Sequence, residues 1–212
     1  MSNTIVSVKP QFGVNYKVGY IGFTFTDNNF ISNGIAWFTR WEKGENTDVP
    51  KLNLSHCFIV DSENECIEAT ENGVVTSPLT KYFNNPHAHV SFRKPIGLTE
   101  LTGHLMALDV SHQLGKPYDY VLIVGHAIDD TFLGKLFDKI TDDKSREFIT
   151  WVFSTKGRFI CSELVAAAMR NRPEYAGKGV LVHPPYSIDP QGLFQSKEIF
   201  SPWSEEIQGE KA

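Results

Sequence analysis

The sequence predicts one domain of the α+β class, and three observations support this expectation. Strand patterns and helical patterns are interspersed along the chain, and two of the strands flank a short polar segment that signals an antiparallel hairpin. The length of 212 residues suits a single core. A hydrophobic content of 41% and a charged content of 21% are ordinary for a folded protein. We therefore expect residues 1–212 to form a single domain.

Strand patterns concentrate in the first half of the chain. Alternating or β-branched and aromatic residues predict strands or extended segments at 19–26, 55–60, 65–70, 73–75 and 87–93. The polar residues 61–64 between the second and third of these segments predict a hairpin. These segments together predict a small antiparallel sheet.

Helical patterns occupy most of the remaining sequence. Within residues 98–114, apolar residues recur at helical spacing through Leu101, Leu105 and Leu108, and Gly115 ends the pattern. Residues 76–82 are expected to form either a turn or a short helix, residues 116–120 a turn, and residues 42–51 a loop. The other helical predictions are 30–41, 131–140, 144–153 and a helix that begins at about residue 161, followed by a proline-rich tail at 182–190.

Composition restricts the classes of partner and compartment. The net charge of −5 and the absence of a Lys/Arg run argue against binding to nucleic acid. Three cysteines do not suggest a disulfide framework and fit a reducing compartment, so we expect a cytoplasmic protein. The first ten residues lack the features of a signal peptide. No apolar run approaches the length that spans a bilayer, so stable membrane insertion is not expected.

Cys161 is the first candidate functional residue. It follows a short apolar segment and precedes Ser162 and Glu163, which favour the first turn of a helix. Free N–H groups and the positive end of the helix dipole would favour the thiolate there and could bind an oxyanion. Buried cysteines more often serve as small hydrophobic residues, so Cys161 needs a base nearby to act as a nucleophile.

His56 and Glu68 are the candidates to activate that cysteine. His56 begins one strand of the predicted hairpin and Glu68 lies twelve residues later, in the other strand. A five-residue connection, 60–64, would place the two side chains directly opposite each other, and a three-residue connection, 62–64, would make them diagonal neighbours on one face. A connection of two or four residues would place them on opposite faces. The sequence leaves these alternatives open.

Three motifs in this order resemble the circularly permuted branch of the NlpC-type papain-like superfamily, which includes YiiX-like hydrolases and lecithin retinol acyltransferase-like enzymes. They are the hairpin from Ser55-His56 to Glu68, the segment Gly115-Lys116-Pro117-Tyr118, and Cys161-Ser162-Glu163-Leu164-Val165 opening a helix. The resemblance covers roughly residues 18–195. It implies a papain-like fold in which a small antiparallel sheet or half-barrel packs on the cysteine helix. The acidic residue that often follows the first glycine of this family is replaced here by Tyr20, and a helical insertion is expected around residues 128–155.

The resemblance also implies residue roles. Cys161 would be the nucleophile, His56 the general base and acid, and Glu68 the residue that orients His56. Tyr118 and Ser162 would help to bind the substrate or the oxyanion. The expected activity is that of a cysteine peptidase, amidase or thiol acyltransferase, which cleaves a peptide, a cell-wall-type amide or an N-acyl or lipid substrate in a cleft and needs no cofactor or metal.

Two other functions remain open from the sequence. One is a papain-fold binding module without turnover. The other is a metal-dependent hydrolase, for which His87 and His89 would share a strand face and be joined by His126 or His183. Cys57 and Cys66 are expected in the core, and Glu163 is explained by the helix dipole.

Overall fold

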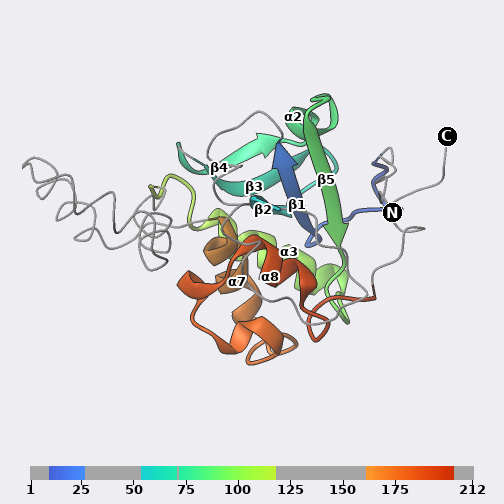
Figure 1. Ribbon diagram of the computed structural model, residues 1–212. Coiled ribbons are helices and arrows are strands. Elements are labelled where there is room, and N and C mark those ends of the chain that lie inside the picture. The colour runs from blue at the N-terminus through green and yellow to red at the C-terminus, as the bar shows by residue number, and fades with distance from the viewer. Residues whose placement is uncertain (1–9, 27–53, 71, 118–160, 203–212) are drawn as a thin grey trace, which may run out of the picture.

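Five antiparallel strands form one open sheet in the order β4-β3-β2-β1-β5 (Figure 1). The computed structural model describes residues 10–26, 54–70, 72–117 and 161–202. The strands are β1 (Ile21–Thr26), β2 (His56–Val60), β3 (Glu65–Thr70), β4 (Gly73–Pro78) and β5 (Ala88–Arg93). Mixed strands and helices confirm the α+β class, and every predicted strand is present, although β4 extends through residues expected to form a turn.

The turn between β2 and β3 selects one of the three alternatives for the hairpin. The Asp61 N–H donates to the Glu65 carbonyl at 3.0 Å, which leaves three residues, 62–64, as the connection. The residue pairs Ile59–Ile67 and Val60–Cys66 follow the same register. Continued along the strands, this register makes His56 and Glu68 diagonal neighbours on one face, as the three-residue alternative requires.

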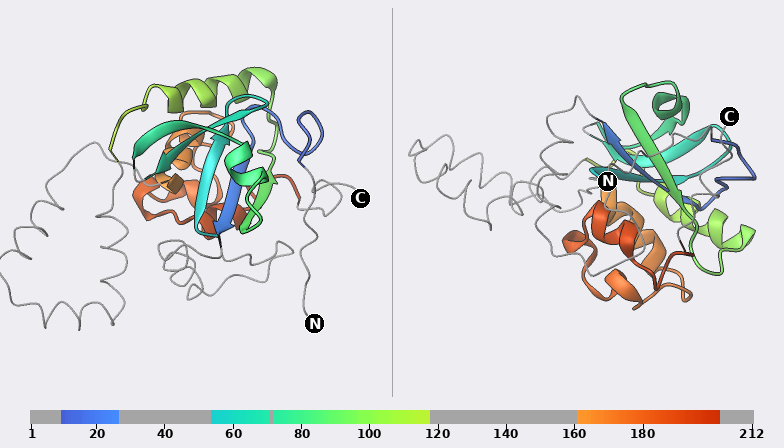
Figure 2. Two further views of the ribbon diagram at one scale, coloured as in Figure 1. Left: turned by 90° about the horizontal axis from the view of Figure 1, so that it is seen from above. Right: turned by 45° about the vertical axis from the view of Figure 1, so that its right-hand side comes forward.

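Helices α3 (Glu100–Ser111), α7 (Cys161–Arg170) and α8 (Pro190–Gln195) lie together against one face of the sheet (Figures 1 and 2). Their buried side chains form one core with the strand residues that point toward them. The one-turn helix α2 (Thr80–Phe83) lies at the other face, where Tyr82 joins a second, more aromatic cluster with Phe58 and Phe92. The sheet is therefore covered on both faces, and the two strand faces have different partners.

A close contact between β1 and β2 requires a glycine. Gly22 pairs with Phe58, and a Cβ added at Gly22 would lie 2.1 Å from the Phe58 ring. The ring therefore folds over the bare backbone of β1. This packing fixes Phe58, which stacks in turn on Tyr82 with ring centroids 5.0 Å apart.

Helix α3 exists where the sequence predicts it, but it buries a different face. The predicted stripe is largely exposed, because Leu101 is 69% and Leu108 is 49% exposed. The buried residues include Gly103 and Met106 instead. Gly103 explains the orientation, since a Cβ there would lie 2.6 Å from the Val18 carbonyl oxygen. The backbone of α3 can approach the start of β1 only through this glycine.

Helix α7 begins at Cys161 and buries the predicted face, which comprises Leu164, Val165, Ala168 and Met169. The proline-rich segment after it contains more regular structure than expected: the 3₁₀ turns η1 (Gly179–Val182) and η2 (Pro185–Ser187), and α8. Asp189 caps α8 by accepting from the N–H groups of Gln191 and Gly192 at 2.8 and 2.9 Å.

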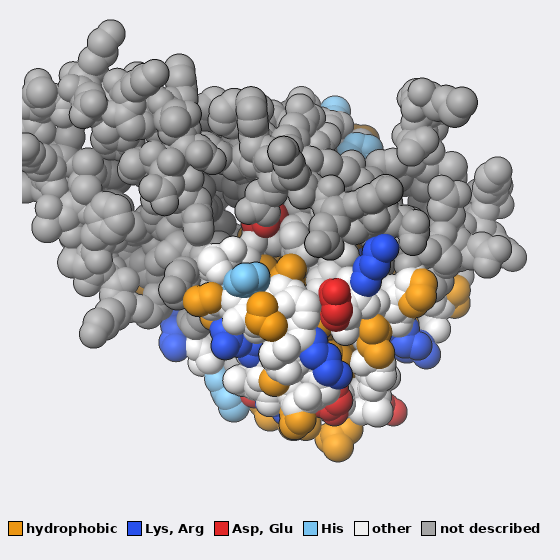
Figure 3. All heavy atoms as spheres, turned by 60° about the horizontal axis from the view of Figure 1, so that its bottom comes forward, with side chains coloured by type: hydrophobic (Ala, Val, Ile, Leu, Met, Phe, Trp, Pro, Cys, Tyr) orange, Lys and Arg blue, Asp and Glu red, His pale blue; other side chains and the backbone are white. Residues whose placement is uncertain are grey.

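The exposed surface of the helical layer is mixed in character. Figure 3 shows hydrophobic, basic and acidic side chains interspersed over its coloured part. No helix among the described residues is long and apolar enough to cross a membrane. The helices predicted at 30–41, 131–140 and 144–153, the loop at 42–51 and the insertion at 128–155 lie outside the described residues.

Candidate active site

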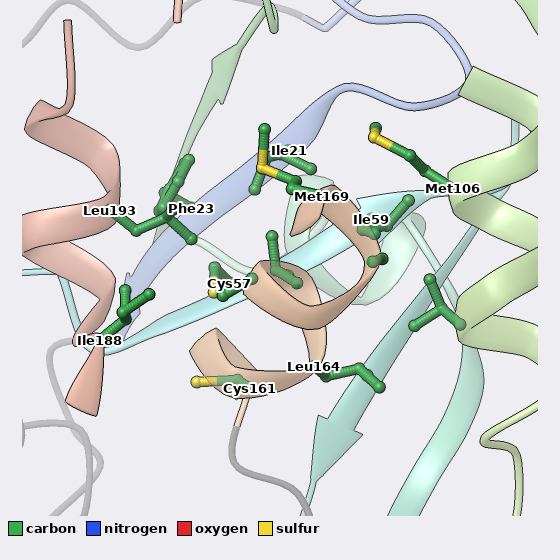
Figure 4. Packing of buried hydrophobic residues seen from close by; sticks show 14 of the residues in the cluster. Ile21, Phe23, Cys57, Ile59, Met106, Cys161, Leu164, Met169, Ile188 and Leu193 are labelled. Atoms are coloured by element: carbon green, nitrogen blue, oxygen red, sulfur yellow. The ribbon is translucent and has the colours of Figure 1, made fainter. Parts of the chain in front are cut away.

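Cys161 is the first residue of α7, as its sequence context predicts. The helix packs directly on β2, and Cys161 joins the core between the helix and the sheet. In Figure 4 the sulfur atoms of Cys57 and Cys161 lie on the same side of α7, whereas Leu164 points the other way. Because Cys161 is the first residue of α7, backbone N–H groups of the first helical turn lack partners within the helix near its side chain.

His56 is the first residue of β2, and the backbone around it is held on two sides. It pairs with Thr24 of β1, and the N–H of Ser55 donates to the Thr24 carbonyl at 3.1 Å. The N–H of Leu54 donates to the Gln191 side chain at 3.4 Å, which ties the entry of the strand to α8. These bonds fix the direction from which the imidazole enters the site.

Glu68 holds the imidazole from β3. The His56 Nε2 and Glu68 Oε2 atoms are 2.6 Å apart, and Glu68 is fully buried. A carboxylate at this distance accepts the Nε2 proton and so fixes both the tautomer and the plane of the ring.

The His56 imidazole and the Cys161 sulfur lie close enough to shift each other's pKa. Burial disfavours the charged imidazole, but the Cys161 thiolate and then the Glu68 carboxylate outweigh burial and raise the pKa of His56 to about 10. The structure thus brings Cys161, His56 and Glu68 into one connected row.

Cys57 is a fourth member of this group. Interaction with the Cys57 thiol is the largest cause of the low pKa of Cys161; burial opposes it, and the charge of His56 reinforces it. Burial and the neighbouring Cys161 thiolate raise the pKa of Cys57 itself, so Cys57 stays a neutral donor. Cys57 is fully buried, as expected of a core residue, but it also interacts with the candidate nucleophile.

Two neighbouring residues of α2 complete the surroundings of Glu68. The Lys81 Nζ atom lies 2.7 Å from Glu68 Oε1, and the Tyr82 hydroxyl donates a short hydrogen bond to Glu68 Oε2. Burial of the Glu68 carboxyl would raise its pKa, but bonds and charges from His56 and Lys81 outweigh it and hold the pKa well below its usual range. Neither residue is recognisable from the sequence as part of the site, because both come from a separate helical turn, 13 and 14 residues after Glu68.

The residues expected to bind an oxyanion are only partly described. Ser162 is fully buried in the first turn of α7, and its hydroxyl oxygen has no hydrogen-bond partner among the described residues. Tyr118 lies outside the described residues. Glu163 lies in the first turn of α7, where an acidic side chain complements the helix dipole.

The site is more enclosed than the expected cleft. Cys161 is only 3% exposed and Glu68 is fully buried, whereas 19% of the His56 side chain is exposed. Of these three residues, His56 therefore provides the contact with solvent.

The alternative metal site receives no support from the described residues. No group of three or more His, Cys, Asp or Glu side chains among them could hold a metal ion. His89 lies in β5, but His87 precedes that strand, so the two are not placed by one regular strand as expected. His126 lies outside the described residues.

The chemical capacity of this arrangement follows from its charges. A thiolate at the start of a helix, an imidazolium beside it and a carboxylate behind the imidazolium are the parts of a nucleophile activated by a base and an orienting group. Burial strengthens each interaction in the row, since water cannot screen the charges.

Comparison of the chain with protein-family models, with curated proteins and with solved structures gave no match.

Proposed function

We propose that this protein is a cysteine hydrolase or acyltransferase that cleaves an amide or ester through an acyl-enzyme on Cys161. The observation that carries the proposal is the His56 imidazole, which lies close to the Cys161 sulfur and 2.6 Å from Glu68. Burying charged groups costs free energy unless they are paired, and apolar side chains would fill the same space without that cost. Core packing alone therefore does not explain a histidine between a buried carboxylate and a thiol at the start of a helix.

The proposed reaction has two steps. The Cys161 thiolate attacks the scissile carbonyl and forms a C–S bond, while N–H groups at the start of α7, together with Tyr118, bind the oxyanion. The His56 imidazolium gives its proton to the leaving amine or alcohol as the bond to the carbonyl carbon breaks. His56 then takes a proton from water or another acceptor, whose oxygen or nitrogen displaces Cys161 and releases the acyl group.

Two further features agree with this assignment. The order of the motifs, with the histidine strand before the cysteine helix, resembles the permuted NlpC-type papain-like superfamily, so we propose a fold of that type. All three cysteines are free thiols in the structure, as expected in a reducing compartment such as the cytoplasm. The substrate classes that fit the resemblance are a peptide, a cell-wall-type amide and an N-acyl or lipid amide.

A thiol-reactive acyl probe tests the proposal. We expect stoichiometric acylation of Cys161, located by mass spectrometry, and at least a 100-fold lower rate in His56→Ala, because general base and acid groups contribute about that much. Cys161→Ala controls for reaction at Cys57 and Cys66. Acylation that persists at the wild-type rate in His56→Ala would contradict the proposed mechanism, and an unreactive Cys161 would leave a binding module as the better description.

A further inference from the structure

The surroundings of Glu68 contain more donors than a histidine-orienting carboxylate needs. The Glu68 Oε2 atom accepts hydrogen bonds from His56 Nε2 and from the Tyr82 hydroxyl. The Oε1 atom accepts one from the Lys81 ammonium. Both oxygens are therefore occupied, and the carboxylate has no freedom to rotate away from the imidazole. Glu68 itself is fully buried, so water cannot replace any of these partners.

The two added donors come from adjacent residues of a single helical turn. Lys81 and Tyr82 lie in α2, which follows β4 and packs against the face of the sheet opposite to α7. The Tyr82 ring is fixed by stacking on Phe58, with centroids 5.0 Å apart, and the Lys81 ammonium lies 5.0 Å from the centre of the same ring. The aromatic packing thus places both donors at once.

We propose that Lys81 and Tyr82 are positioning residues of the candidate site, which hold the Glu68 carboxylate ionised and aimed at His56. This inference rests on the proposed function. With Lys81 added, the row has four charged members of alternating sign. They are Lys81 (positive), Glu68 (negative), His56 (positive) and Cys161 (negative). Lys81 and Tyr82 both bond the Glu68 carboxylate, so both act through Glu68.

The protonation state of Tyr82 supports this role. Burial and the neighbouring Glu68 carboxylate raise the pKa of Tyr82 far above its usual value, so the phenol keeps its proton and remains a donor to Glu68. Lys81 differs in exposure, since 45% of its side chain is exposed. It can therefore be replaced with less risk to the fold than the buried tyrosine.

Acylation kinetics with p-nitrophenyl acetate test the inference. We expect the single-turnover acylation rate to fall about 10-fold in Lys81→Met and in Tyr82→Phe, as for other residues that orient a site through a neighbour. Lys81→Arg should recover to within about 3-fold of wild type, because it restores a cation able to bond the carboxylate. The matched controls are Lys178→Met, at an exposed lysine, and Tyr175→Phe, at a buried tyrosine whose hydroxyl has no partner in the described part of the chain.

A double-mutant cycle with Glu68→Gln separates positioning from general stability. If Lys81 acts through the carboxylate, Lys81→Met should change the rate by less than about 2-fold in the Glu68→Gln background, whereas an independent effect would remain 10-fold. Circular dichroism and the melting temperature identify any variant that does not fold. Should Tyr82→Phe prove unfolded, the Lys81 cycle decides alone.

The possible failures are distinct. If wild-type protein shows no acylation, the proposed function fails, and this inference fails with it. If wild-type protein is acylated and His56→Ala is not, but Lys81→Met and Tyr82→Phe keep the wild-type rate, only the positioning role is wrong. An undiminished Lys81→Met effect in the Glu68→Gln background would also overturn it.

Discussion

Cys57 shows how one residue can belong to the core and to the candidate site. Its side chain alternates away from that of His56 along β2, and it is fully buried between the sheet and the helices. This same alternation directs it toward the start of α7, where its thiol interacts with the Cys161 sulfur. Consecutive residues of β2 thus supply the candidate base, His56, and the thiol of Cys57 next to the candidate nucleophile.

Replacing Cys57 by alanine should raise the pKa of Cys161. The lost interaction with the Cys57 thiol is the largest cause of the low pKa, so without it the Cys161 thiolate is less stabilised. The measurement is the pH at which alkylation of Cys161 by iodoacetamide reaches half its maximal rate. We expect this midpoint to move upward in Cys57→Ala.

Cys66→Ala is the matched control for this prediction. Cys66 is also a buried strand cysteine, but its thiol bonds the Ser77 carbonyl at 3.6 Å. It should leave the alkylation midpoint where it is in wild type. An unchanged midpoint in Cys57→Ala would show that the Cys57 thiol does not stabilise the Cys161 thiolate.

At the scale of elements, α3 separates helix formation from helix orientation. Thr99 caps it by accepting from the Thr102 N–H at 3.0 Å, and this start is readable from the sequence. The buried face is not readable in the same way, because the leucine spacing is satisfied by a stripe that the structure leaves exposed. The close approach of Gly103 to the Val18 carbonyl decides the rotation of the helix.

Two alanine substitutions on α3 test this orientation. Met106 is fully buried, so Met106→Ala should lower the free energy of unfolding by about 2–5 kcal/mol. Leu101 is 69% exposed, so Leu101→Ala should change it by no more than about 0.5 kcal/mol. Urea denaturation of both variants provides the comparison. A larger loss at Leu101 than at Met106 would mean that α3 is rotated toward the stripe predicted from sequence.

For the molecule as a whole, the paired thiolate and imidazolium link stability to pH in an unusual way. The pKa of His56 is raised from 6.5 to about 10, so its contribution is complete below pH 6.5 and is lost as the pH rises to about 10. The pKa of Cys161 is lowered, so its contribution is complete above the unfolded value of about 8.5 and is lost as the pH falls. Between pH values of about 6.5 and 8.5 the two slopes cancel, because the folded pair and the unfolded pair hold one proton each.

We therefore expect the contribution of this pair to the free energy of unfolding to show a plateau when it is plotted against pH. The quantity to measure is the difference between wild type and a Cys161→Ala/His56→Ala double variant, from urea denaturation between pH 5 and 10. It should be constant from about pH 6.5 to 8.5 and fall on both sides with slopes approaching about 1.4 kcal/mol per pH unit. Working above pH 5 avoids the protonation of unfolded Glu68, whose contribution is lost only at lower pH. A difference that changes steadily across the plateau range would show that the folded pair does not hold one proton throughout it, and would contradict the opposite shifts of the two pKa values.

The sequence by itself determined the local elements and the candidates they carry. Alternation predicted the strands, capping and composition placed Cys161 at the start of α7, and an even spacing allowed His56 and Glu68 to share a face. These properties depend on backbone periodicity and on neighbours within a few residues, which the sequence states directly.

Only the tertiary structure decided how those elements meet. The three-residue turn fixed the His56–Glu68 register, Gly103 fixed the rotation of α3, and the packing of Tyr82 on Phe58 brought Lys81 and Tyr82 to Glu68. Each of these outcomes depends on contacts between residues distant in sequence, or on the geometry of a single turn. No periodicity encodes them, because steric fit and the pairing of buried charges are settled only when the elements pack together.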